Sequence, residues 1–208
     1  MQIVSYVQDT FQECLPFKWG LSLFSFGCNL KCEVCLGYNY EKVTNKDNII
    51  GNAIDLIDKL ITPVHDCVVF IGGEPTIWGE ELVLALKHCK NKGLKTKIFT
   101  NGMLPDTIDK INSLNLCDAW SLDYKCLRDA DKVCNIENGL YVSNILKSIK
   151  VLVESEKPLE IRTTFYPGNE RDRQEITYDM NWVISCCKKN GDRYCKFIDQ
   201  SDHRRFLK

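Results

Sequence analysis

Long apolar runs, an excess of charge of one sign and low-complexity tracts are all missing from this sequence. No stretch approaches the roughly 20 apolar residues that a membrane-spanning helix needs, and residues 1–10 lack both the basic and the apolar region of a secretory signal. The net charge of −1 leaves no basic footprint of the kind that marks nucleic-acid binding. We therefore expect a soluble, cytoplasmic protein that binds neither a membrane nor a nucleic acid.

Cysteine, by contrast, is abundant, with 12 in 208 residues. An even number would suggest disulfides in a secreted protein, but without an export signal we expect reduced thiols. Several cysteines, such as Cys67 and Cys89, lie in apolar or helical patterns, where a thiol acts as a small hydrophobe. Three others, Cys28, Cys32 and Cys35, form a compact C-x3-C-x2-C group.

These three cysteines offer a soft, convergent ligand set that suits an iron–sulfur cluster. A [4Fe–4S] cube has four irons, so three cysteines leave one iron open to a substrate or cofactor. A zinc site would favour paired C-x2-C units and a fourth Cys or His. Few candidates for that ligand lie nearby, so a non-catalytic zinc or iron–sulfur protein is the remote alternative.

Apolar patterns alternate between strand and helix about six times. We predict strands over 20–26, 67–71, 95–100, 118–123, 159–164 and 194–198, and helices over 49–61, 80–92, 141–154, 171–189 and from Pro105. Such alternation predicts an α/β fold with parallel strands and right-handed crossovers. A complete eight-unit barrel needs about 250 residues, so we expect a partial (β/α)6 TIM-like barrel. No linker divides residues 1–208, which predicts one domain with a core of about 18–200, a short N-terminal lead-in and a C-terminal tail.

Polar and glycine-rich segments follow the predicted strands. In α/β barrels the carboxyl ends of the strands carry the active site, so we expect these segments to meet. They are Gly72-Gly73-Glu74-Pro75, Thr100-Asn101-Gly102, Asp123-Tyr124-Lys125 and Arg162-Thr163-Thr164.

The cysteine group followed by Gly72-Gly73-Glu74-Pro75 resembles the radical S-adenosylmethionine (SAM) superfamily. The later strand ends are similar to those of glycyl-radical-enzyme activases, in particular the type that activates anaerobic ribonucleotide reductase, and the likeness runs over about residues 20–168. Two positions depart from that pattern. Val34 stands before Cys35 where many members have an aromatic residue, and Phe99 stands where activases often carry an acidic residue that helps to hold a monovalent cation.

The resemblance implies two cofactors, a [4Fe–4S] cluster on Cys28, Cys32 and Cys35 and SAM on its open iron. The residues it implies for SAM binding are Gly72, Gly73, Glu74, Pro75, Thr100, Asn101, Asp123, Lys125 and Arg162. For Arg162, a substrate contact or a structural ion pair is also open.

The implied reaction is reductive cleavage of SAM to a 5′-deoxyadenosyl radical, which installs a glycyl radical on a partner enzyme such as anaerobic ribonucleotide reductase. A reduced flavodoxin or a ferredoxin-type protein would supply the electron. The alternative is a radical SAM enzyme that acts on a small molecule or peptide, similar to 7-carboxy-7-deazaguanine synthase.

Overall fold

The computed structural model describes residues 1–32, 35, 40–125, 130–163, 170–189 and 194–199. The strands are β1 (Gln2–Thr10), β2 (Gly20–Ser25), β3 (Gly51–Asn52), β4 (Cys67–Gly72), β5 (Lys95–Thr100), β6 (Ala119–Asp123), β7 (Leu159–Thr163) and β8 (Cys195–Asp199). The helices are α1 (Tyr40–Thr44), α2 (Ala53–Leu60), α3 (Gly79–Asn91), α4 (Pro105–Ser113), α5 (Ala130–Cys134), α6 (Asn138–Glu154) and α7 (Glu170–Lys189), with 3-10 turns η1 (Lys46–Asn48) and η2 (Pro75–Trp78).

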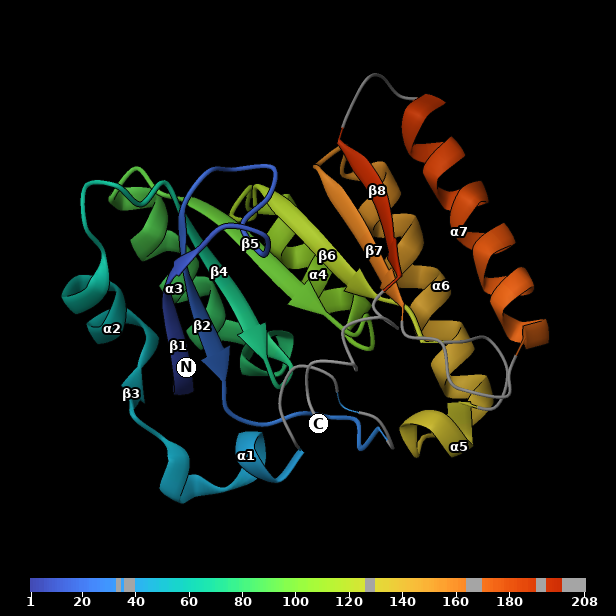
Figure 1. Ribbon diagram of the computed structural model, residues 1–208, viewed down its shortest axis with the longest axis horizontal. Helices are drawn as coiled ribbons and strands as arrows, with labels where there is room; N and C mark the ends of the chain where they lie inside the picture. The colour runs from blue at the N-terminus through green and yellow to red at the C-terminus, as the bar shows by residue number, and fades with distance from the viewer. Residues whose placement is uncertain (33–34, 36–39, 126–129, 164–169, 190–193, 200–208) are drawn as a thin grey trace.

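All the described strands form one mixed sheet in the order β3-β1-β2-β4-β5-β6-β7-β8. The six strands from β2 to β8, leaving out β3, run parallel in sequence order. The crossover helices gather on one face of the curved sheet (Figure 1). In the described part of the chain β3 and β8 remain the two ends of the sheet, so the barrel is open. The predicted α/β fold with a partial six-unit barrel is confirmed.

The N-terminal segment is a full strand rather than the short lead-in expected from the sequence. β1 pairs antiparallel with β2 and, over Gln2 and Ile3, with β3. Its register with β2 shifts between Ile3 and Ser5 and again between Val7 and Thr10. These irregularities break the regular alternation of buried and exposed positions, which explains why the apolar pattern did not reveal the strand.

Local capping residues set the helix boundaries. α2 begins at Ala53, four residues later than the apolar spacing predicts, because the Asn52 side chain accepts a hydrogen bond from the backbone N–H of Asp55 at 3.0 Å. α3 ends before Gly93, whose φ of +73° stops the helix as predicted. Pro105 is the first residue of α4.

The two faces of the parallel strands differ in chemistry. Trp120, Leu122 and Ile161 are buried in the apolar core with residues of the crossover helices. Glu160 and Arg162, which alternate with Ile161 along β7, line a cavity on the opposite face. The helices therefore stabilise one side of the sheet, and the other side faces an interior that mixes charged groups with apolar side chains such as Ile71 and Phe99.

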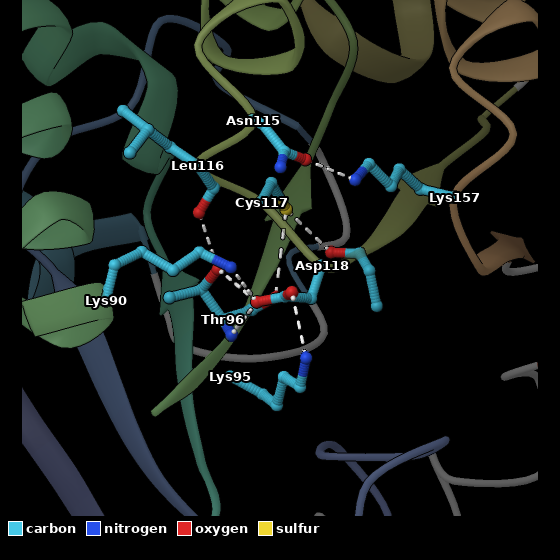
Figure 2. Close-up of polar contacts among 9 residues, drawn as sticks. Lys90, Lys95, Thr96, Asn115, Leu116, Cys117, Asp118 and Lys157 are labelled. Atoms are coloured by element: carbon cyan, nitrogen blue, oxygen red, sulfur yellow. Dashed lines mark hydrogen bonds and ion pairs between the residues drawn. The ribbon is translucent and has the colours of Figure 1, made fainter. Parts of the chain in front are cut away.

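A polar cluster ties the amino ends of β5 and β6 together, at the opposite end of these strands from the predicted site (Figure 2). The carboxylate of Asp118 accepts hydrogen bonds from the backbone N–H and hydroxyl of Thr96 at 2.9 and 3.2 Å. It also pairs with Lys90 and, at 3.5 Å, with Lys95. These contacts give Asp118 a structural role.

None of the described helices has the length and apolar character that crossing a membrane requires. None of the eleven described cysteines takes part in a disulfide. Cys67 and Cys89 are buried, in agreement with their apolar sequence surroundings. Of the residues discussed in the sequence analysis, Val34 and Thr164 lie outside the described part of the chain.

Candidate active site

The cysteine segment leaves the carboxyl end of β2 through a glycine turn. The backbone N–H of Phe26 donates to the Gln2 carbonyl at 3.0 Å, and that of Gly27 donates to the Val43 carbonyl at 2.6 Å. Gly27 has a φ of +84°, which glycine tolerates and other residues rarely adopt. The turn therefore leads directly from the sheet into the predicted metal ligands.

Cys28, Cys32 and Cys35 line one cavity. Cys28 and Cys32 are partly buried and Cys35 is exposed. Burial, with a smaller contribution from the negative charge of Glu74, raises the pKa of the Cys28 thiol to about 12. Among the described residues, no three His, Cys, Asp or Glu side chains gather closely enough to hold a single metal ion. Three cysteine thiols that line one cavity are a soft ligand set of the kind that suits an iron–sulfur cluster.

A fourth cysteine lies beside this segment, although nothing in the sequence spacing links it to the other three. Cys134, at the end of α5, is completely buried. Its carbonyl accepts a hydrogen bond from the Lys31 backbone N–H at 3.3 Å. A hydrogen bond from the Cys134 thiol lowers the pKa of Cys32. About a hundred residues separate the two cysteines, so only the fold could bring them together.

Gly72 and Gly73 bring the end of β4 against the start of the cysteine segment. Gly73 donates to the Ser25 carbonyl at 3.1 Å. A Cβ atom on Gly73 would lie 1.9 Å from the Gly27 carbonyl oxygen, and one on Gly72 would lie 2.7 Å from the Phe24 Cα. Side chains at these two positions are therefore excluded by backbone atoms, which explains the glycine pair in physical terms.

Glu74 joins the ends of β4 and β5 from a buried position, with 1% of its surface exposed. Its Oε1 accepts from the Thr76 and Thr100 hydroxyls at 2.6 and 2.9 Å, and its Oε2 accepts from the Asn101 backbone N–H at 2.6 Å. Burial raises the pKa of Glu74, and these hydrogen bonds oppose that shift. Because both carboxylate oxygens already have protein donors, the contacts indicate that Glu74 organises the site.

Asn101 connects the end of β5 to the cysteine segment. Its amide nitrogen donates to Asn29 Oδ1 at 2.8 Å and lies 3.9 Å from the Cys28 sulfur. Its Oδ1 accepts from the Met103 backbone N–H at 3.0 Å. The side chain is thereby held in one orientation next to a predicted cluster ligand.

Asp123 ends β6 and forms an ion pair with Lys125, whose Nζ lies 2.5 Å from Asp123 Oδ2. Lys125 is 5% exposed, and its backbone N–H donates to the Tyr141 hydroxyl at 3.0 Å. Asp123 Oδ1 is buried and has no hydrogen-bond partner among the described residues. This acceptor is available to a bound molecule, as an amino-group contact requires.

Arg162 turns toward Phe99 and Glu160. The centre of its guanidinium lies 4.4 Å from the centroid of the Phe99 ring, and its Nη2 lies 2.9 Å from Glu160 Oε2. The activases that this sequence resembles often carry an acidic residue at position 99. Here the Phe99 ring instead contacts the cationic side chain of Arg162 in a cation–π interaction.

These segments surround a cavity of about 910 Å³. Every residue predicted to hold the cluster or SAM lines it except Pro75, which is buried at the start of η2. The cavity also reaches the outermost long strands of the open sheet, at Val7 and Thr10 of β1 and at Lys196 and Ile198 of β8. The fold thus assembles the predicted residues around one space, while their binding of cofactors stays a prediction.

Comparison with known proteins decides the family. The family model that describes the Radical SAM superfamily at the level of sequence matches residues 22–180, well over half of the chain. The chain belongs to the radical SAM superfamily. The predicted resemblance is therefore confirmed, and membership of this superfamily implies a [4Fe–4S] cluster and SAM as the class of cofactors.

Two curated relatives of this radical SAM protein come from Methanocaldococcus jannaschii. One, named provisionally as a glycyl-radical enzyme activating enzyme, is 31% identical over 179 residues, which are 84% of this chain and 73% of the relative. The other, a 7-carboxy-7-deazaguanine synthase, is 30% identical over 139 residues, which are 61% of this chain and 55% of that protein.

Solved structures agree with the fold. SuiB of Streptococcus suis, solved with its precursor peptide SuiA, has a TM-score of 0.57 and 20% identity to this radical SAM protein. The match covers 86% of this chain but 38% of SuiB, so the chain spans less than half of that protein. SuiB has also been solved with SAM bound, at a TM-score of 0.55.

Proposed function

We propose that this protein is an activase that installs a glycyl radical on a partner enzyme, most simply one of the anaerobic ribonucleotide reductase type. The likeness to the archaeal activating enzyme over 84% of the chain carries this proposal. The open barrel supports it, because a cavity that reaches both β1 and β8 leaves an approach for a protein segment.

In this proposal Cys28, Cys32 and Cys35 hold a [4Fe–4S] cluster and leave one iron open. The cluster and SAM together would supply a 5′-deoxyadenosyl radical, which takes a hydrogen atom from a glycine Cα of the partner. A reduced flavodoxin or ferredoxin-type protein would provide the electron.

The polar strand ends would orient SAM in the cavity. The backbone of Gly72 and Gly73 allows close approach, and Asp123 Oδ1 offers an unused acceptor for the SAM amino group. Lys125 would balance the SAM carboxylate, and Thr100 and Asn101 would contact the cofactor from β5. Glu74 and Pro75 would hold this wall in place, since Glu74 bonds to Thr100 and Asn101.

The test is anaerobic reconstitution with iron and sulfide, followed by incubation with SAM, a reductant and a candidate partner. We expect a glycyl-radical EPR signal on the partner and release of 5′-deoxyadenosine. Cys32→Ala should lose both the cluster absorbance and SAM cleavage, whereas Cys186→Ala, a partly exposed cysteine on α7, should keep both. Full activity of the Cys32 variant would refute the scheme.

A second candidate is a reaction on a small molecule, favoured by the likeness to 7-carboxy-7-deazaguanine synthase. Release of 5′-deoxyadenosine without a radical on any glycyl-radical enzyme would support it over the activase.

A further inference from the structure

A buried ion pair lies inside the barrel, on the cavity side of the sheet. Lys97 of β5 and Glu160 of β7 are 0% and 1% exposed, and the Lys97 Nζ lies 2.8 Å from Glu160 Oε2. Lys97 also donates to the Leu15 carbonyl at 2.7 Å. Arg162 lies next to this pair, and both Glu160 and Arg162 line the cavity.

Glu160 faces more positive charge than it can neutralise. Its Oε2 accepts from Lys97 and from Nε and Nη2 of Arg162, at 3.3 and 2.9 Å for the arginine, while its Oε1 accepts from the Tyr194 hydroxyl at 3.1 Å. Two cations thus share one carboxylate, which leaves one excess positive charge. Arg162 has five N–H donors, of which the described contacts with Glu160 engage the one on Nε and one of the two on Nη2.

The other carboxylates on the cavity wall have contacts of their own. Glu13 accepts from the Thr10 hydroxyl at 2.6 Å, Asp123 pairs with Lys125, and Asp199 pairs with Arg173. Glu74 is enclosed by its donors from η2 and β5. Glu13 keeps its negative charge beside the Thr10 hydroxyl, and Lys196 of β8 lines the same cavity. Arg162 differs from Lys196 in that it shares one carboxylate with a second cation.

An unused hydroxyl opens into the same cavity from β2. Ser22 is 1% exposed, lines the cavity, and its Oγ has no hydrogen-bond partner among the described residues. A buried polar group without a partner is costly, and native proteins usually supply one. Ser22 of β2 and Arg162 of β7 therefore line one cavity, and each keeps a polar group that a bound molecule could satisfy.

We propose that Arg162, supported by Lys97 and Glu160 and accompanied by Ser22, binds a carboxylate of the substrate that gives up the hydrogen atom. A planar guanidinium matches a planar carboxylate, and one excess positive charge matches a single negative charge. The Phe99 ring, stacked with Arg162, gives the subsite an apolar wall. The assignment builds on the proposed function, in which a substrate enters this cavity.

Two sources could bring that carboxylate. It belongs either to an acidic residue of the partner segment that carries the glycine or to a small organic acid. The first measurement therefore tests whether the subsite binds a carboxylate, and the second identifies which molecule carries that carboxylate.

The subsite is measured by calorimetry on the reconstituted protein with SAM present and no reductant, so that no turnover occurs. The probe is glutarate, and its neutral amide, glutaramide, is the matched ligand. We expect glutarate to bind at least about tenfold more tightly than glutaramide, because a charge-assisted hydrogen bond to arginine favours the anion.

The variants are chosen to leave the fold intact. Arg162→Gln should weaken glutarate binding about tenfold or more, and Ser22→Ala about threefold or more, and the SAM affinity of each variant is measured in parallel. Ser25→Ala is the matched control, because Ser25 is a buried serine on the same strand whose Oγ also has no hydrogen-bond partner among the described residues but which does not line the cavity. Circular dichroism and melting temperature confirm that each variant is folded.

Three results would overturn the subsite: equal binding of glutarate and glutaramide, no detectable glutarate binding, or an Arg162→Gln variant that binds glutarate like the wild type. Loss of SAM affinity in Arg162→Gln with unchanged glutarate binding would make this arginine a SAM contact instead.

Peptides from a candidate partner show whether the partner or a small organic acid carries the carboxylate. A peptide spanning the glycine of a candidate partner is compared with a version whose acidic residues are replaced by their amides. Weaker binding of the amide version to the wild type, but not to Arg162→Gln, places the carboxylate on the partner. If both peptides bind alike while glutarate still needs Arg162, the subsite holds, the carboxylate belongs to a small organic acid, and the activase function fails.

Discussion

At the scale of single residues, the site depends on positions where no other side chain fits. Gly73 is the clearest, because the Gly27 carbonyl oxygen occupies the space of its Cβ at 1.9 Å. Glycine and proline mark turns everywhere in proteins, so the sequence alone indicates a turn here. The structure adds the reason for this particular glycine, which is the contact between the end of β4 and the cysteine segment.

Gly73→Ala should therefore disrupt the site more than the fold. The backbone must shift by more than an ångström to relieve the clash, and this would weaken the bonds of Gly73 to Ser25 and of Glu74 to Gly27. We expect at least about tenfold loss of SAM affinity in the reconstituted protein, since small displacements of a binding wall are costly. Gly139→Ala on α6, where the backbone has no positive φ and a Cβ meets only Glu137 Oε1 at 3.8 Å, tests for a general effect of replacing glycine. Normal SAM binding by Gly73→Ala would contradict the role of close approach.

Asp118 provides a residue-scale prediction on stability. Burial raises its pKa, but the hydrogen bonds from Lys90 and Thr96 and the charges of Lys90 and Lys95 outweigh burial and hold the pKa below the usual 3.8. A lowered pKa in the folded state stabilises the protein above the unfolded value and loses that contribution as the pH falls through the folded value.

Asp118→Asn should thus lower the free energy of unfolding at neutral pH, and the difference from the wild type should shrink below about pH 4. Urea unfolding across this range measures it, with the exposed Asp109→Asn as control. A difference that stays constant down to acidic pH would contradict the assignment of this stabilisation to the ionised carboxylate.

At the scale of elements, the sequence predicts the six parallel strands because each is a short apolar run between turn residues. β1 could not be predicted, because it precedes the repeating strand–helix units and its pairing register with β2 is irregular. The contacts inside the barrel could not be predicted from local sequence either. Lys97 and Glu160 are 63 residues apart and carry ordinary surface chemistry, so only the alignment of β5, β6 and β7 shows that they form a buried pair.

Lys97 connects β5, β7 and the segment between β1 and β2, through Glu160 and the Leu15 carbonyl. Lys97→Met should reduce the free energy of unfolding by about 3–5 kcal/mol, because it leaves the buried Glu160 with an incomplete set of partners. Adding Glu160→Gln to this variant should recover part of the loss by removing the buried charge.

Chemical denaturation followed by circular dichroism measures both variants. Lys95→Met serves as the control on the same strand, since its ammonium is more than half exposed and its pairing with Asp118 is worth at most about 1 kcal/mol. A double variant less stable than Lys97→Met would show that the Glu160 carboxylate is compensated without Lys97.

At the scale of the whole molecule, sequence and structure contribute different parts of the site. The cysteine spacing and the strand-end segments could be predicted from local sequence, and every residue predicted there to hold the cluster or SAM lines one cavity except Pro75. Packing between distant segments places Cys134 beside Cys32 and leaves the Ser22 hydroxyl without a partner among the described residues. Local sequence patterns do not report such packing. The open edge of the sheet is likewise a property of the complete strand order.

That open edge separates the two proposed classes of substrate. Val7 lies on β1 at the margin of the cavity and is 46% exposed. Val7→Trp should obstruct a protein segment entering there and reduce glycyl-radical formation on the partner about tenfold or more, since small misplacements of a substrate strongly slow its reaction. SAM cleavage without a partner should stay within about twofold, as for most surface changes.

The matched control is Val64→Trp, because Val64 is an exposed valine, at 65%, that does not line the cavity. EPR quantifies the glycyl radical, and chromatography quantifies 5′-deoxyadenosine. The turnover of a small-molecule substrate that enters the cavity elsewhere would not be changed by Val7→Trp. Equal radical yields from both tryptophan variants would therefore place the partner's approach away from the β1 edge, whereas a loss confined to Val7→Trp would identify that edge as the entrance for the glycine-bearing segment.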